Sequence, residues 1–213
     1  MKKLESFELS YVRLKEELED LQNLLDSTTT LKERDQVRPF FAERPNLCAA
    51  LGYLANDIAL PDLMSSEQRF FDDFIADVAV GDSESRTFNL IEFEDAYPYS
   101  IFKRLEPGKL LKHWSGRFEH GQSQLIDWAW RLSEEGSSKA VTRIFGTPDP
   151  AMHLILIIGR DSDLTQDDLV RLRWRTNALS LGAYKMSCFT FDGVLNAIRR
   201  RLVLADRAVA ETA

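Results

Sequence analysis

Leu90-Ile91-Glu92-Phe93-Glu94 is an apolar stretch that carries two carboxylates, and it indicates more about the fold than any other part of the chain. Successive side chains of a β-strand point to opposite faces, so Glu92 and Glu94 leave the same face with their bases about 7 Å apart. An earlier apolar run contains a third carboxylate, Asp77. Like charges buried beside apolar neighbours cost free energy that a divalent cation can offset. The pattern therefore predicts a buried strand and a metal site held by Asp77, Glu92 and Glu94.

The residues around this stretch predict a β-hairpin. Phe70 to Val80 and Phe88 to Glu94 have the composition of strands, and the polar residues 81–85 between them have the composition of a turn. Adjacent strands would place Asp77 beside Glu92. The connection that follows, residues 95–121, contains two prolines and three glycines, which predicts a long irregular segment.

The rest of the chain alternates predicted helices and strands. Met152 to Ile158 is an uninterrupted apolar run, which indicates a strand buried on both faces. Thr165 can cap the N-terminus of one helix, and Asp192 that of a last, basic helix. The elements predicted after the hairpin are a helix over 122–132, a strand over 152–158, a helix over 165–181, a strand over 184–191 and a helix over 192–207. This order predicts an α/β fold with a mixed central sheet flanked by helices.

The first thirty residues carry a heptad pattern. Its two apolar positions are Leu4, Tyr11, Leu18 and Leu25, and Phe7, Leu14 and Leu21. The pattern predicts an N-terminal amphipathic helix within residues 1–30, ahead of one domain over residues 31–213. This helix either packs on its own domain or pairs between the subunits of a homo-oligomer. A second helix is expected to begin near Leu31 and to break or restart at Arg38-Pro39, because the residue before a proline avoids the helical region.

Composition limits the classes of protein that this chain can belong to. It has 213 residues, of which 44% are hydrophobic and 29% charged, as expected of a soluble protein with one core. No apolar run approaches the roughly 18 residues of a membrane helix, and no secretory signal is visible. The two cysteines form neither a ligand spacing nor a disulfide framework. We therefore expect a cytoplasmic protein without a membrane partner.

The net charge of −7 argues against a general polyanion binder, but positive charge is concentrated in two regions. One runs from Arg171 to Arg207, and the other, from Lys103 to Arg117, directly follows the glutamate strand. Such residues are either solvated helix faces or a local track for phosphate groups.

Four segments together resemble the nuclease domain of the Shedu anti-phage defence family, within the PD-(D/E)XK superfamily. They are residues 74–82 (FIADVAVGD), 91–96 (IEFEDA), 114–121 (WSGRFEHG) and 124–128 (QLIDW). The resemblance covers about Glu33 to Leu204. It implies a restriction-endonuclease-like fold and an endonuclease that hydrolyses DNA phosphodiesters with Mg²⁺, or alternatively Mn²⁺, in prokaryotic defence.

The resemblance also implies roles for individual residues. Asp77 and Glu92 would hold the metal ion, with the carbonyl of Phe93 completing its shell. Gln124 matches the glutamine at the start of a helix in this family, with Gln122 as its rival. Glu33 matches the acid of an early helix, with Glu43 as its rival.

One position departs from the superfamily pattern, because Glu94 stands where lysine is usual. Glutamate there would serve as a ligand of a second metal ion or as a general base. The phosphate charge would then be met by Arg117 and His120, with Lys103 and Arg104 behind them. The same departure leaves an alternative function, a catalytically inactive nuclease fold that binds DNA or a protein partner.

Overall fold

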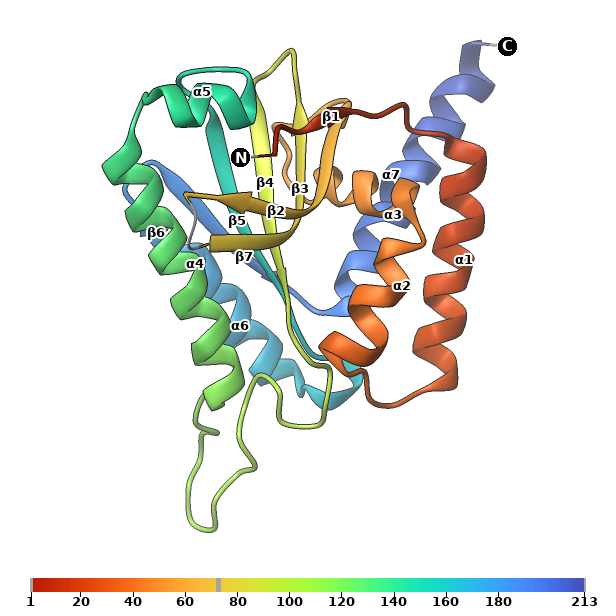
Figure 1. The fold of residues 1–213 in the computed structure, drawn as a ribbon. Coiled ribbons are helices and arrows are strands. Elements are labelled where there is room, and N and C mark those ends of the chain that lie inside the picture. Colours follow the sequence, from red (N-terminus) through yellow and green to blue (C-terminus); the bar gives the residue numbers. More distant parts are fainter. Residues whose placement is uncertain (1, 72–73, 213) are drawn as a thin grey trace.

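A seven-stranded sheet lies at the centre of the computed structural model, which describes residues 2–71 and 74–212 (Figure 1). Its strand order is β1-β2-β3-β4-β5-β7-β6. The pairs β1–β2, β2–β3 and β3–β4 are antiparallel. The pairs β4–β5 and β5–β7 are parallel, and β6 is antiparallel to β7. The strands are β1 (Glu5–Ser6), β2 (Leu63–Phe70), β3 (Phe74–Asp82), β4 (Thr87–Phe93), β5 (Ala151–Ile157), β6 (Ser180–Leu181) and β7 (Tyr184–Phe189). The predicted mixed α/β sheet is confirmed.

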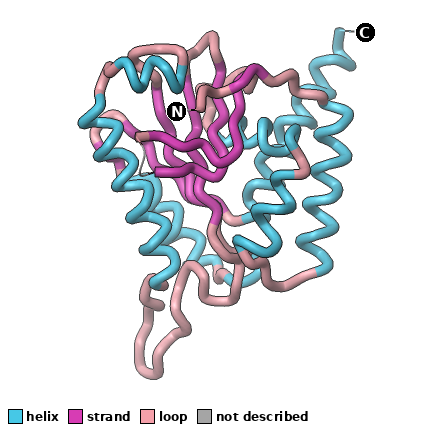
Figure 2. Tube along the Cα trace, viewed as in Figure 1, coloured by secondary structure: helices cyan, strands magenta, loops and turns pink. Residues whose placement is uncertain are grey.

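Helices cover both faces of this sheet and form two apolar clusters with it (Figure 2). One face packs against α1 (Tyr11–Ser27), α2 (Arg38–Ala42), α3 (Pro45–Ala50) and α7 (Phe191–Thr212). The other face packs against α4 (Gly116–Glu135), α5 (Lys139–Phe145) and α6 (Gln166–Ala178). Short helical turns complete the chain: a π-helix over Glu33–Val37 and 3-10 turns over Leu51–Leu54 and Asp161–Asp163.

The hairpin that carries the carboxylates has the predicted pairing but different bounds. Val78 lies opposite Ile91 on β3 and β4, so Asp77 and Glu92 are on adjacent strands. The strand predicted over Phe70–Val80 corresponds to β3, but its predicted start is wrong, because Phe70 ends a separate strand, β2, that was not predicted and that pairs with β3. The predicted apolar strand 152–158 corresponds to β5, which is enclosed between β4 and β7.

Helix α4 begins six residues earlier than predicted. Ser115 caps it, with its side chain accepting a hydrogen bond from the backbone N–H of Phe118 at 3.0 Å. The irregular connection therefore ends at Ser115, and Arg117 and His120 lie on the first turns of a helix. A short helix that the sequence did not indicate, α5, follows it. The predicted cap of α6 is confirmed, since Thr165 and Asp168 form a reciprocal capping box.

The N-terminal heptads are helical only from Tyr11. Ser10 caps α1, whereas Leu4 precedes β1 and its N–H bonds to the carbonyl of Ile144. The heptad leucines of α1 (Leu14, Leu18, Leu21 and Leu25) are buried in the same cluster as residues of α3 and α7. Their apolar face thus packs on the domain itself, and the division at residue 30 and the homo-oligomer stay predictions.

The predicted restart at Arg38-Pro39 is confirmed, since the π-helix ends at Val37 and α2 begins at Arg38. Its predicted reason is wrong, because Arg38 keeps helical angles, with φ −58° and ψ −48°. Pro39 lies in the first turn of α2, a position at which proline is common in helices. As for membranes, none of the helices within residues 2–71 and 74–212 combines the length and apolar character needed to span a bilayer.

Candidate active site

A polar cleft of about 470 Å³ opens where β4 ends. Three parts of the chain line it: the π-helix with Arg38, the end of β4, and the first turns of α4. Most of the residues that the sequence singled out meet here, namely Glu33, Glu92, Glu94, Arg117, His120 and Gln124. Gln122 and Glu43, the two rivals, are not among the residues that line the cleft.

Asp77 and Glu92 form the buried acidic pair of the site. Their exposed fractions are 5% and 4%. Oδ2 of Asp77 accepts a hydrogen bond of 2.8 Å from the backbone N–H of Phe93, which fixes this carboxylate against β4. On the other side Glu67 of β2 has a positive φ of 47° and interrupts the β2–β3 pairing opposite Asp77.

Burial raises the pKa of both carboxyls. The pKa of Glu92 rises to about 9, first because burial penalises its charged form and then because Asp77 and Glu94 repel it. The pKa of Asp77 rises to about 6 through burial, against the hydrogen bond from Phe93 and the charge of Arg38. Near neutral pH the pair therefore holds a proton unless a cation replaces it.

Glu94 is 1% exposed and lies where α4 approaches the sheet. Burial raises its pKa to about 7, opposed by the positive charge of Arg117. The approach requires Gly121, because a Cβ at that position would lie 2.7 Å from Cδ1 of Leu156 and 3.3 Å from Cγ of Glu94. A larger residue there would clash with Leu156 and press on the side chain of Glu94.

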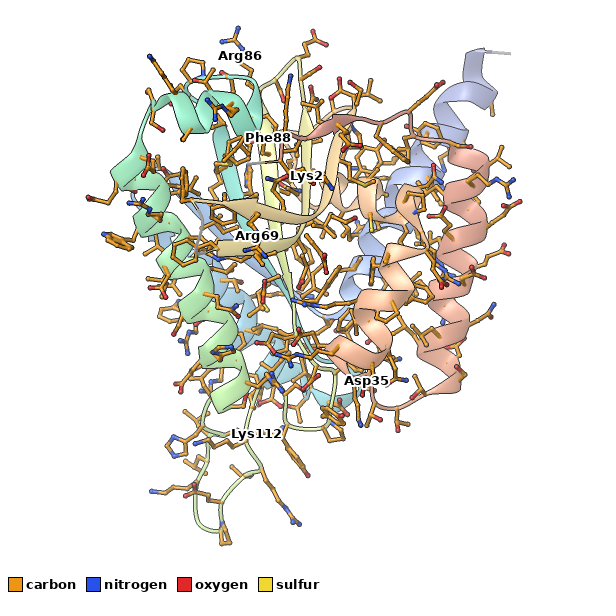
Figure 3. All side chains as sticks on the ribbon, in the orientation of Figure 1. Lys2, Asp35, Arg69, Arg86, Phe88 and Lys112 are labelled. Carbon is orange, nitrogen blue, oxygen red and sulfur yellow. The ribbon has the colours of Figure 1, made fainter. Side chains whose placement is uncertain are left out.

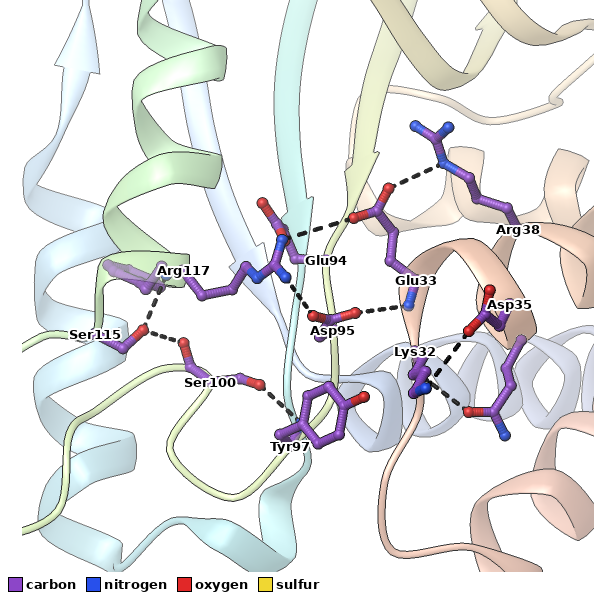
Figure 4. A network of polar contacts seen from close by, with 12 residues as sticks. Lys32, Glu33, Asp35, Arg38, Glu94, Asp95, Tyr97, Ser100, Ser115 and Arg117 are labelled. Carbon is purple, nitrogen blue, oxygen red and sulfur yellow. Dashed lines mark hydrogen bonds and ion pairs between the residues drawn. The ribbon is translucent and has the colours of Figure 1, made fainter.

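Two arginines meet the acidic groups from opposite sides (Figure 4). Arg38 lies 2.5 Å (Nη2) from Oδ1 of Asp77 and 3.2 Å (Nε) from Oε1 of Glu33. Arg117 lies 3.0 Å (Nη1) from Oε2 of Glu94 and 2.6 Å (Nη2) from Oδ2 of Asp95. The other oxygen of Asp95 accepts the N–H of Glu33 at 2.7 Å, so the network joins the π-helix, the end of β4 and α4.

Arg38 and Asp95 were missed in the sequence. Arg38 follows Glu33 by five residues, a spacing that places both on one side of a π-helix but not of an α-helix. No sequence pattern indicates a π-helix here. Asp95 directly follows the glutamate strand and lies within the segment IEFEDA that resembles the Shedu family, and these two signals could have identified it.

Several carboxylate and amide oxygens in the site lack hydrogen-bond donors. Among the described residues, Oε2 of Glu92 and Oε1 of Gln124 are buried with no partner, and Oδ1 of Asp77 and Oε2 of Glu94 have only the arginine ion pairs. Buried oxygens of this kind are suitable ligands for Mg²⁺, which takes one or two carboxylates and keeps several waters. The donor set of Asp77 and Glu92 fits such an ion.

A site with three carboxylate ligands is not assembled. Within residues 2–71 and 74–212, no group of three or more His, Cys, Asp or Glu side chains is placed to hold one metal ion. Arg38 pairs with Asp77 at one end of the network, and Arg117 pairs with Glu94 at the other. Lys103 and Arg104 are exposed on the connection between β4 and α4 and do not line the cleft.

Comparison with known protein families matches residues 30–195 to the family described as Shedu protein SduA, C-terminal. A comparison with curated proteins returned no match. The matched region contains the hairpin, the cleft and both arginines, and it spans more than half of the chain. This protein therefore belongs to the Shedu SduA C-terminal family.

Proposed function

We propose that this protein is a metal-dependent endonuclease that hydrolyses DNA phosphodiesters in prokaryotic anti-phage defence. The observation that supports this most is the pair of buried carboxylates, Asp77 and Glu92. Glu92 lines the polar cleft together with two arginines, and Asp77, which lines a second cavity, pairs with one of them, Arg38. Burying acidic groups this deeply lowers the stability of a protein. Acidic groups whose pKa values are strongly raised, as those of Asp77 and Glu92 are, occur frequently at functional sites. Membership of the Shedu family supports the role in defence.

Asp77 and Glu92 would hold Mg²⁺ or Mn²⁺, and the predicted carbonyl of Phe93 would be a third protein ligand. When bound, the ion supplies a Lewis acid for a phosphoryl oxygen and lowers the pKa of a water molecule. The proton that the pair keeps at neutral pH would leave as the ion binds, because a ligating carboxylate must be ionised.

Glu94 takes the role of general base in this proposal. A carboxyl with a pKa of about 7 is partly ionised at neutral pH and basic enough to take a proton from water. Water oxygen would bond to phosphorus as its proton passes to Oε2 of Glu94. The ester P–O bond on the opposite side would break, and the leaving oxygen would keep the electron pair and take a proton from solvent. Gln124 would orient this water through its unpartnered Oε1.

Arg38 and Arg117 would provide the positive charge that lysine provides elsewhere in the superfamily. Their side chains are 39% and 45% exposed and face the cleft, and a guanidinium can bind a phosphate with two hydrogen bonds. In this proposal each arginine exchanges a carboxylate partner for a phosphate oxygen when DNA enters. His120, on the same turns of α4, would contact the next phosphate.

The test is cleavage of linear and plasmid DNA in Mg²⁺ or Mn²⁺, with wild type, Glu92→Gln and the exposed control Glu134→Gln on α4. Wild type and the control should cut, whereas Glu92→Gln should lose cleavage and keep its circular dichroism spectrum. Calorimetric titration of Mn²⁺ should give heat with wild type that Glu92→Gln lacks.

Two results would refute the proposal. Equal cleavage by Glu92→Gln would remove the acidic pair from the chemistry. DNA binding without cleavage in any divalent ion would favour the inactive fold that binds DNA as a scaffold.

A further inference from the structure

The connection between β4 and α4 projects from the body of the protein (Figure 1). Its outer part, residues 103–113, is named here the finger, and Lys112 on it is labelled in Figure 3. The two sides of the finger run antiparallel at its base, where the N–H of Lys103 bonds to the carbonyl of His113 at 2.8 Å. Phe102 and Trp114 pair just below.

The base of the finger is held by an aromatic stack. The rings of Phe102 and Trp114 are 4.4 Å apart, and those of Trp114 and Phe118 are 4.6 Å apart. Two guanidiniums of α6 cover this stack, with Arg171 4.9 Å from the ring centroid of Phe102 and Arg175 4.4 Å from that of Trp114. The stack fixes the direction in which the finger leaves the molecule.

The end of the finger is a defined turn. The N–H of Lys109 bonds to the carbonyl of Glu106 at 3.1 Å, and Gly108 has a φ of +76°. Proline at the second position and glycine with positive φ at the third are the signature of a type II turn. Pro107 and Gly108 thus make a preformed turn.

Apolar side chains follow this turn into water. Leu110 is 97% exposed and Leu111 62% exposed, so neither supports the core. Lys103, Arg104 and Lys109 are exposed around them, against the single acid Glu106. On a chain of net charge −7, the finger combines local positive charge with three exposed leucines, the third being Leu105 at 45%. This combination suits duplex DNA, whose phosphates are negative and whose stacked bases are apolar.

The finger lies next to the cleft along the chain. Two residues after its end Ser115 caps α4, and Arg117 on the first turn of this helix pairs with Glu94 and Asp95 in the cleft. A duplex whose phosphate enters the cleft would therefore pass the base of the finger.

We propose that the finger binds duplex DNA, with Lys103, Arg104 and Lys109 on phosphates and with Leu110 and Leu111 inserted between base pairs as a wedge. This inference rests on the proposed function, because it places the duplex in the cleft. Leucine wedges of this kind unstack a base step and bend the duplex, and the new contacts offset the cost. The substrate would be opened next to the scissile phosphate.

The experiment uses the full chain without divalent metal, so that binding is measured apart from cleavage. Duplexes with 2-aminopurine at successive positions report unstacking by fluorescence, and anisotropy reports affinity. Wild type should raise the 2-aminopurine signal at one or two adjacent steps. Leu110→Ser with Leu111→Ser should abolish this rise and weaken binding about tenfold, whereas Leu60→Ser, an exposed leucine on another loop, should behave as wild type.

Charge is tested separately. Lys103→Gln with Arg104→Gln should reduce the slope of log affinity against log salt by about two, the value expected for two lost phosphate contacts. The fluorescence rise should persist in this variant at a protein concentration that saturates the duplex.

Three outcomes would overturn the inference. The double leucine variant could bind and unstack DNA like wild type, or wild type could bind duplex without unstacking it. In the third outcome the leucine variant loses only self-association, measured by sedimentation. The last would make the finger an interface between copies of the chain. A wild type that unstacks duplex but cuts it in no metal would refute the proposed function and leave the wedge intact.

Discussion

Replacing Glu92 by glutamine should make the protein less sensitive to pH in the absence of metal. The pKa of Glu92 is raised to about 9, while the same group in the unfolded chain ionises near 4.5. Between these values the folded state keeps a proton that the unfolded state has released, so stability falls as pH rises. Glutamine resembles the protonated carboxyl and cannot lose that proton.

The size of the effect follows from one proton held by the folded state alone. The slope is about 1.4 kcal/mol per pH unit, so the free energy of unfolding should fall by about 2 kcal/mol from about pH 6.5 to about pH 8 through Glu92. The window avoids the lowered pKa of Asp82, Asp57 and Asp168, which ionise at more acidic pH. Glu94 contributes to wild type and variant alike.

The assay is urea unfolding at several pH values across this window, in EDTA. Wild type and Glu134→Gln should share a downward slope, and Glu92→Gln should have a smaller one and be more stable than wild type near pH 8. Parallel lines for wild type and Glu92→Gln would refute the reasoning, because Glu92 would then be ionised in the folded state at neutral pH.

Three further results are expected. The rise in Tm on adding Mn²⁺ should grow from about pH 6 to about pH 8, because the ion competes with the proton of the acidic pair. This rise should vanish in Glu92→Gln, and a rise that does not depend on pH would contradict the competition. Arg38→Gln should tighten Mn²⁺ binding in calorimetry, because Asp77 no longer pairs with a guanidinium, and it should weaken the binding of DNA. A loss of both affinities would show that Arg38 is structural. Gly121→Ala should lower stability by about 1–3 kcal/mol, because its Cβ would lie 2.7 Å from Cδ1 of the buried Leu156, and should also lower cleavage, because it would press on Glu94. A variant that unfolds and cuts like wild type would contradict this close packing.

Local patterns in the sequence determined much of the framework. The alternation around Glu92 predicted the strand β4, which contains Glu92 and ends directly before Glu94. The apolar run 152–158 identified the central strand β5, and Thr165 marked the start of α6. These signals depend on neighbours two to four residues away, which the chain order contains directly. For the same reason β2 was missed, since Leu63–Phe70 has no apolar alternation strong enough to separate it from β3.

The tertiary structure alone decided how the carboxylates are partnered. Arg38 meets Asp77 and Arg117 meets Glu94 only because α2 and α4 pack on opposite sides of the end of β4. Burial, which raises the pKa values of Asp77, Glu92 and Glu94, is likewise a property of the packed sheet and helices. The sequence determined which acids face one another along the strands, because side-chain direction follows backbone geometry. Their charge and their partners were decided by distances between segments that are far apart in the chain, and these exist only once the core has formed.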